Sequence, residues 1–123
     1  MLKKLKNNLA ILIPAFKTRF FRETLNSIAN QTCKNFTLYV GDDCSPENIE
    51  EITFEYSNVI NIKYIKFPNN IGAKHLVNQW NRCLNLVNDE EWIWLFSDDD
   101  IMDKDCVKSF YFSLENSKVK MQK

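Results

Sequence analysis

Glycine, proline and histidine are scarce in this sequence, with two, three and one residues among 123. Gly41 and Gly72 alone cannot build the glycine-rich loops that cradle phosphates in many nucleotide-binding proteins, and a collagen or linker composition is excluded as well. A zinc-finger pattern is also excluded, because only one histidine is present and no two cysteines form a C-x-x-C pair. No stretch approaches 18 consecutive apolar residues, so the sequence predicts no membrane-spanning helix.

The cysteines and the N-terminus bear on the cellular compartment. The four cysteines are Cys33, Cys44, Cys83 and Cys106. We interpret them as free thiols of a reducing cytosol, and two disulfides of a secreted domain are the alternative. The start of the chain resembles a signal peptide, but Pro14 ends its apolar run early and no small-residue cleavage site follows. We expect a cytoplasmic protein, with peripheral association at the inner membrane face as a further option.

The sequence does contain enough apolar material for one packed domain. Hydrophobic residues make up 45% and aromatic residues 13%, and 123 residues suit a single domain over 1–123. The formal net charge is zero, which argues against a nucleic-acid partner. The charges lie in blocks, with six acidic and no basic residues in 37–60 and eight acidic residues and one basic residue in 89–106. The acidic blocks are therefore where we expect a cation.

Apolar runs alternate with amphipathic segments along the chain. We expect strands at 9–13, 36–40, 60–67 and 92–96, and helices at 20–32, 46–58, 76–87 and from 103 or 104, before a polar tail from about Ser117. Ser45 is expected to cap the second helix, the 92–96 strand to be fully buried, and Trp80, Trp92 and Trp94 to lie in the core. Four strands alternating with four helices predict a three-layer α/β/α fold with a mainly parallel sheet.

Unusual residues follow each of the four predicted strands. They are Ala15–Lys17, Asp42–Asp43, Asn69–Gly72 and Asp98–Asp100. Ligands of open parallel sheets bind beyond the carboxyl ends of the strands, so we expect these four loops to line one edge of the sheet. Both glycines lie at this edge, which indicates backbone that passes close to another group.

The run Asp98–Asp100 is the strongest chemical signal. Three adjacent carboxylates repel one another and are costly without a cation. Oxygen ligands favour Mg²⁺ or Mn²⁺, and Mg²⁺ commonly binds one or two carboxylates together with substrate phosphates, so a nucleotide diphosphate is a natural partner. The alternative is an acidic start of the last helix, capped by Asp100 or Asp103.

Three other positions allow two interpretations each. Asp42–Asp43 could accept a hydrogen bond from a nucleobase N–H or form an Asx-type turn. Lys17 could meet a phosphate or remain solvated. His75 falls near a helix start, where a packed or exposed histidine is a more ordinary reading than a catalytic base.

Taken together, these segments resemble the N-terminal part of a family 2 glycosyltransferase with the GT-A fold. The matching segments are 11–16, 24–28 with Gln31 and Thr32, 39–45, 70–72 and 92–100. The resemblance implies that the first segment packs near the nucleotide base and that one aspartate of the Asp42–Asp43 pair accepts the uracil N3–H. It further implies that Asp98–Asp100 form the D-x-D element, which meets the ribose and the metal on the diphosphate.

The resemblance thus implies a complete donor site on this chain. The donor nucleotide would contact Pro14, Ala15, Phe16, Lys17, Asp42, Asp43, Asn70, Gly72, Asp98 and Asp99, and Mg²⁺ or Mn²⁺ would bind Asp98, Asp99 and Asp100. The activity implied is metal-assisted, inverting transfer of a sugar from a nucleotide-diphosphate donor, most naturally a UDP-sugar, to a glycan or lipid-linked acceptor. The sequence departs from the usual pattern at Lys17, Cys44 and Ser97, where Asn, Gly and Asp are common, and at Val77-Asn78, where Arg-Asn is common.

The resemblance also implies that the domain continues past this chain, towards the acceptor site and a carboxylate base. No residue here fits that base, so we expect a truncated GT-A fold, a fragment that is inactive alone and that can self-associate through an apolar sheet edge. The alternative function is a non-catalytic nucleotide-binding or interaction module. A Mg²⁺-binding receiver domain is disfavoured, because its acidic pair after the first strand is replaced by Pro14-Ala15.

Overall fold

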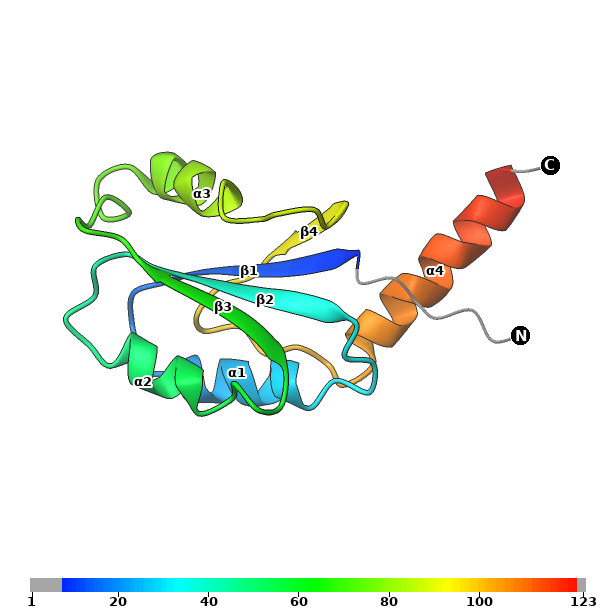
Figure 1. The fold of residues 1–123 in the computed structure, drawn as a ribbon, viewed down its shortest axis with the longest axis horizontal. Helices are drawn as coiled ribbons and strands as arrows, with labels where there is room; N and C mark the ends of the chain where they lie inside the picture. Colours follow the sequence, from blue (N-terminus) through cyan, green and yellow to red (C-terminus); the bar gives the residue numbers. More distant parts are fainter. Residues whose placement is uncertain (1–7, 122–123) are drawn as a thin grey trace.

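A computed structural model of the protein describes residues 8–121 and contains one open sheet with four helices (Figure 1). The strands are β1 (Leu9–Ala15), β2 (Phe36–Asp42), β3 (Asn61–Lys66) and β4 (Trp92–Leu95). The helices are α1 (Phe21–Ala29), α2 (Ile49–Phe54), α3 (Leu76–Leu84) and α4 (Cys106–Met121). The strand order is β3-β2-β1-β4 and every pair is parallel, as predicted.

Strand β1 lies in the interior of the sheet and pairs on both sides. Leu9 is aligned with Phe36 of β2 and with Trp92 of β4, and Ala15 reaches the level of Asp42. Its apolar run is buried on both faces, which explains why the run shows no alternation of apolar and polar residues. The neighbouring Met1–Lys6 segment lies outside the described residues.

Helices cover both faces of the sheet unequally. In Figure 1, α1 and α2 lie on one side of the strands and α3 on the other. The larger core joins Ile11 and Ile13 of β1 to Leu25 and Ile28 of α1. The smaller core, on the α3 side, contains the buried residues Ala10, Leu12, Tyr39 and Cys83. The three-layer α/β/α prediction is therefore confirmed, with one thick and one thin outer layer.

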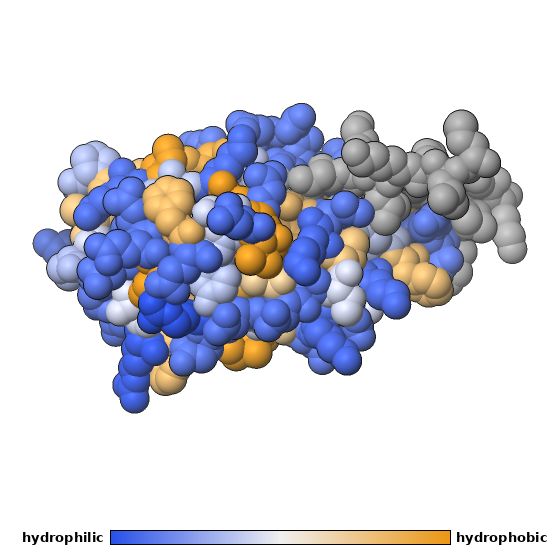
Figure 2. Space-filling view, turned by 60° about the horizontal axis from the view of Figure 1, so that its bottom comes forward, coloured by the Kyte–Doolittle hydropathy of each residue, from blue (hydrophilic) through white to orange (hydrophobic). Residues whose placement is uncertain are grey.

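Strand β4 differs most from the sequence prediction. We expected a fully buried strand, but Trp92 is 46% and Leu95 41% exposed, because β4 is an edge strand that pairs only with β1 in the described chain. The expectation that the tryptophans are core residues is likewise wrong for Trp80 and Trp92, which are exposed, while Trp94 packs partly buried against the core. On the face that it presents, Figure 2 shows hydrophobic areas set among hydrophilic side chains.

Helix boundaries also differ from the predicted ones. Helix α2 begins at Ile49, because Ser45 instead donates its hydroxyl to the Phe16 carbonyl and accepts the Glu47 N–H within a turn. Helix α3 ends at Leu84, and α4 begins only at Cys106 but continues to Met121, so the expected tail from Ser117 is helical in part.

Two further expectations concern thiols and membranes. All four cysteines are free thiols, as expected. Between residues 8 and 121, no helix combines the length and apolarity that crossing a bilayer requires.

Candidate functional site

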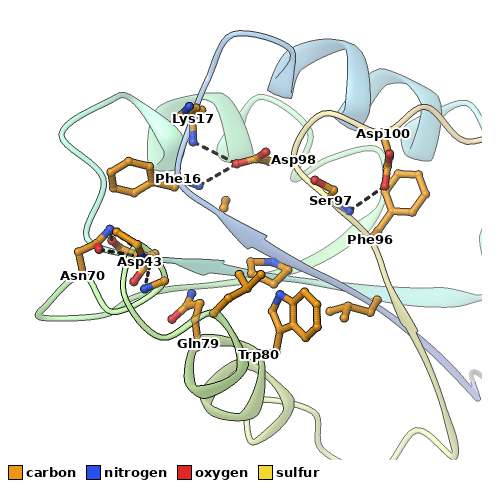
Figure 3. A pocket seen from close by; sticks show the side chains of 16 residues that line it. Phe16, Lys17, Asp43, Asn70, Gln79, Trp80, Phe96, Ser97, Asp98 and Asp100 are labelled. Atoms are coloured by element: carbon orange, nitrogen blue, oxygen red, sulfur yellow. Dashed lines mark hydrogen bonds between the residues drawn. The ribbon is translucent and has the colours of Figure 1, made fainter.

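Three of the strand ends and the loop after β3 surround a cleft of about 620 Å³ (Figure 3). Its lining residues are Pro14–Lys17, Asp43, Asn70, Gly72, Ala73, Leu76, Gln79, Trp80, Leu95–Asp98 and Asp100. Figure 3 shows Asp43 and Asn70 on one side of the cleft and Ser97 and Asp100 on the other. The loops from four separate parts of the sequence thus meet at one edge of the sheet, as parallel strand topology requires.

Asp43 organises one side of this cleft. Its carboxylate is 6% exposed and accepts hydrogen bonds at Oδ1 from the Ile71 N–H at 3.0 Å and at Oδ2 from the Gly72 N–H at 2.9 Å. The Asn70 side-chain amide donates to Oδ2 at 3.2 Å and to the Asp43 carbonyl at 3.1 Å. The loop after β3 is therefore folded around this single carboxylate.

Gly72 shows why a glycine is needed in this loop. A Cβ at this position would lie 2.5 Å from Asp43 Oδ2, closer than any normal contact, although the backbone of Gly72 has no positive φ. A Cβ at Gly41 would similarly lie 2.5 Å from the Cys83 Sγ atom. Both glycines therefore permit close approach, as their position in the sequence indicated.

The neighbouring Asp42 faces away from the cleft. It is 1% exposed, accepts the Ser45 N–H at Oδ1 (2.9 Å), and accepts the Tyr64 hydroxyl at Oδ2 (2.6 Å). Burial, and the hydrogen bond to Asp42, raise the pKa of Tyr64 well above its usual range. Asp42 thus forms the turn that was one of its two interpretations, and it is absent from the cleft lining.

The turn after β2 carries a conformational cost. Cys44 has a φ of 54°, the only positive φ of a non-glycine residue between positions 8 and 121. Such a conformation is unfavourable for a residue with a Cβ and is adopted readily by glycine. In the family 2 glycosyltransferase pattern that the sequence resembles, this position is commonly glycine.

The three aspartates after β4 take three different partners. Asp98 Oδ2 accepts the backbone N–H groups of Phe16 and Lys17 at 2.9 and 3.0 Å, which joins the end of β4 to the end of β1. Asp99 accepts the Ser97 hydroxyl at 2.6 Å, and Asp100 accepts the Ser97 N–H at 3.2 Å. Asp98 and Asp100 line the cleft and Asp99 does not.

This arrangement bears on the predicted metal ion. Across residues 8–121, no three Asp, Glu, His or Cys side chains come together in a group that could hold a metal, so Asp98, Asp99 and Asp100 do not form such a cluster. Two cleft carboxylates, Asp98 and Asp100, nevertheless suit Mg²⁺ or Mn²⁺, because these ions commonly take one or two carboxylates and obtain their remaining ligands from phosphates and water.

Helix α3 supplies cleft residues that were not predicted from the sequence. Leu76, Gln79 and Trp80 line the cleft, and Trp80 is 37% exposed. The helical spacing of Leu76 and Trp80 indicated a core face, and Gln79 gave no signal in the sequence. His75, at the helix start, is exposed and outside the cleft lining.

Comparisons with known proteins identify the class. Residues 10–121 match the family described as Glycosyl transferase family 2, and the chain belongs to this family. The solved structure of S. aureus TarS 1-349 in complex with UDP-GlcNAc is 26% identical, with a TM-score of 0.78, and the match covers 91% of this chain and 32% of that one. The complex of the same protein with UDP is 25% identical, with a TM-score of 0.79 and the same coverage.

Two further similarities are more limited. The chondroitin synthase of Escherichia coli is 39% identical over 62 residues, which are 49% of this chain and 9% of that protein. The mannosyltransferase PcManGT from Pyrobaculum calidifontis, solved with GDP-Man and Mn²⁺, is 14% identical with a TM-score of 0.65 over 76% of this chain and 28% of that one, which shows a shared fold. The chain thus spans only a third or less of these relatives.

Proposed function

We propose that the cleft binds the nucleotide of a UDP-sugar and that the chain is the donor-binding part of an enzyme that transfers this sugar. The observation that carries the proposal is that one cleft is lined by Asp43 and Asn70 and also by Asp98 and Asp100. Solved structures of similar fold, 25% and 26% identical, were determined with UDP and UDP-GlcNAc, which supports the choice of nucleotide.

The proposed roles follow from the chemistry of each side. The polar side with Asp43, Asn70 and Gly72 would receive the nucleobase, while Pro14 and Phe16 would pack against it. The acidic side would hold the diphosphate through a divalent cation, since a carboxylate attracts phosphate only through a positive charge.

Asp98 and Asp100 are the residues that would hold Mg²⁺ or Mn²⁺. The Asp98 Oδ2 atom already accepts two backbone N–H groups, so this residue also keeps the end of β1 in place. When bound, the ion would neutralise charge that develops on the leaving diphosphate.

The acceptor half of the reaction is a separate part of the proposal. We propose direct displacement with inversion at the anomeric carbon, towards a glycan or lipid-linked acceptor in the cytoplasm. The acceptor hydroxyl needs a general base, and no residue of this sequence fits that role. These 123 residues are therefore proposed to bind donor without transferring the sugar unaided.

Isothermal titration calorimetry with UDP and GDP, with and without Mn²⁺, tests the proposal. We expect UDP to bind more tightly than GDP, and Mn²⁺ to increase the affinity for UDP. Asp100→Asn should remove the increase due to Mn²⁺, whereas Asp89→Asn, at an exposed position outside the cleft, should keep it. UDP binding that needs neither Mn²⁺ nor Asp100 would favour the non-catalytic nucleotide-binding module, and absence of UDP binding would refute the proposal.

A further inference from the structure

Arg82 of α3 lies directly behind the polar side of the cleft. Its Nη2 donates to Asp43 Oδ1 at 2.7 Å, and the side chains of this ion pair are 19% and 6% exposed. Arg82 is not among the cleft-lining residues, so a ligand in the cleft would not touch it. Its effect on a ligand must therefore pass through Asp43 or through the loop that Asp43 holds.

The guanidinium group of Arg82 also makes hydrogen bonds to two other residues and stacks on an aromatic ring. Nη1 donates to Asn69 Oδ1 at 3.0 Å, Nη2 donates also to the Asn69 carbonyl at 2.9 Å, and Nε donates to Gln79 Oε1 at 2.8 Å. The guanidinium carbon lies 3.8 Å from the centroid of the Phe67 ring, in stacking contact. A planar fork of five donors can make these contacts together, and a lysine ammonium cannot.

These contacts link α3 to the loop after β3, directly at Asn69 and through Asp43 at Ile71 and Gly72. Arg82 holds Asn69 at the start of the loop, and Asp43 holds Asn70, Ile71 and Gly72 in its remainder. The negative charge of Asp43 is almost fully buried, and among the described residues Arg82 is its only ion-pair partner. Breaking such a pair leaves an uncompensated buried charge, so the loop and the carboxylate would have to rearrange without Arg82.

We infer that Arg82 is a positioning residue for nucleobase selection: through its contacts with Asp43 and Asn69 it holds the polar side of the cleft in the arrangement that distinguishes one nucleobase from another. This inference rests on the proposed donor site, since it assigns the nucleobase to the side of Asp43. It concerns selectivity, because the acidic side with Asp100 shares none of these contacts.

The test measures the affinity of the 123-residue chain for UDP and CDP by calorimetry in Mn²⁺, for the unaltered chain and for Arg82→Gln, Arg82→Lys and Arg22→Gln. UDP and CDP carry the same diphosphate and ribose, so their affinity ratio reports on the nucleobase alone. We expect Arg82→Gln to lower the preference for UDP about tenfold, the effect of one charge-assisted hydrogen bond. Arg82→Lys should restore part of the preference, because it keeps the charge.

The matched control separates positioning from general stability. Arg22→Gln breaks the other ion pair of the described chain, the one with Glu55. The two side chains of that pair are 54% and 46% exposed, and neither lines the cleft. This variant should leave the UDP to CDP ratio unchanged. A loss of folded protein scales both affinities equally, so a purely structural role of Arg82 would also leave the ratio unchanged.

A second variant covers the case in which Arg82→Gln does not fold. Asn69→Ala, at an exposed position, removes the side-chain acceptor of Arg82 Nη1 and should also lower the ratio, by a smaller factor. Equal ratios in the unaltered chain, Asn69→Ala and every folded Arg82 variant would overturn the inference, as would an unaltered chain that binds UDP and CDP equally. An unaltered chain that binds neither nucleotide would instead refute the proposed function itself.

Discussion

Replacing Gly72 with alanine should disturb the hydrogen bonds of Asp43. The new Cβ would lie 2.5 Å from Asp43 Oδ2 and 3.5 Å from Gln79 Cγ. Asp43 cannot simply turn aside, because Arg82 and the Ile71 N–H hold its other oxygen. The Gly72 N–H bond to Oδ2, now 2.9 Å, is therefore the contact most directly strained.

The expected cost follows from two opposing effects. Loss of a hydrogen bond to a charged group costs about 1.5–3 kcal/mol. Replacing glycine by alanine restricts the unfolded chain and offsets about 0.4–1 kcal/mol of this loss. We therefore expect the free energy of unfolding of Gly72→Ala to fall by about 0.5–2.6 kcal/mol.

Urea unfolding followed by tryptophan fluorescence measures this change, and calorimetry measures UDP affinity in the same variant. We expect UDP affinity to fall by more than the loss of folded protein explains, because Asp43 lies on the cleft. The control is Val77→Ala on α3, a position that is 63% exposed and outside the cleft lining, which should change neither quantity appreciably. A Gly72→Ala protein as stable as the unaltered chain, or with unchanged UDP affinity, would refute this account of the loop.

Two further predictions concern buried groups outside the cleft. Tyr64→Phe should lower the free energy of unfolding in urea by about 1–3 kcal/mol, because Asp42 Oδ2 loses its hydroxyl donor while remaining buried. An unchanged midpoint of the urea unfolding transition would contradict this prediction. Burial raises the pKa of Cys83 from 9.0 to about 11, so the folded state favours its neutral thiol. The free energy of unfolding in urea should hold below about pH 9 and fall as the pH rises towards about 11. This fall should be smaller in Cys83→Ala. The same pH profile in Cys83→Ala and the unaltered chain would count against the prediction.

The fold could be predicted from the sequence because its signals are local. The apolar run of β1 indicated a strand buried on both faces, and the alternation of strands with helices indicated parallel pairing, since crossover connections impose it. Parallel pairing alone then brings the loops after the strands to one edge. The meeting of Phe16, Asn70 and Asp98 at the cleft therefore needed no knowledge of side-chain contacts.

The choice of partners within that edge depended on the tertiary structure. Asp42 ends β2 and continues the face of Leu38 and Val40, which packs in the larger core, whereas Asp43 turns towards the cleft. Successive residues of a strand point to opposite faces, so two adjacent aspartates of equal chemistry must differ in role. The sequence does not show which face of the sheet holds the cleft.

Contacts between distant residues and the exposure of β4 were likewise decided only in three dimensions. Arg82 is 39 residues from Asp43, and its periodic position on α3 carries no mark of the pairing. Strand β4 is apolar enough to be interior, but the strand order places it at an edge of the described sheet. Local periodicity determines which elements form and in which direction they run, whereas packing between elements decides which charged groups meet and which apolar faces remain open.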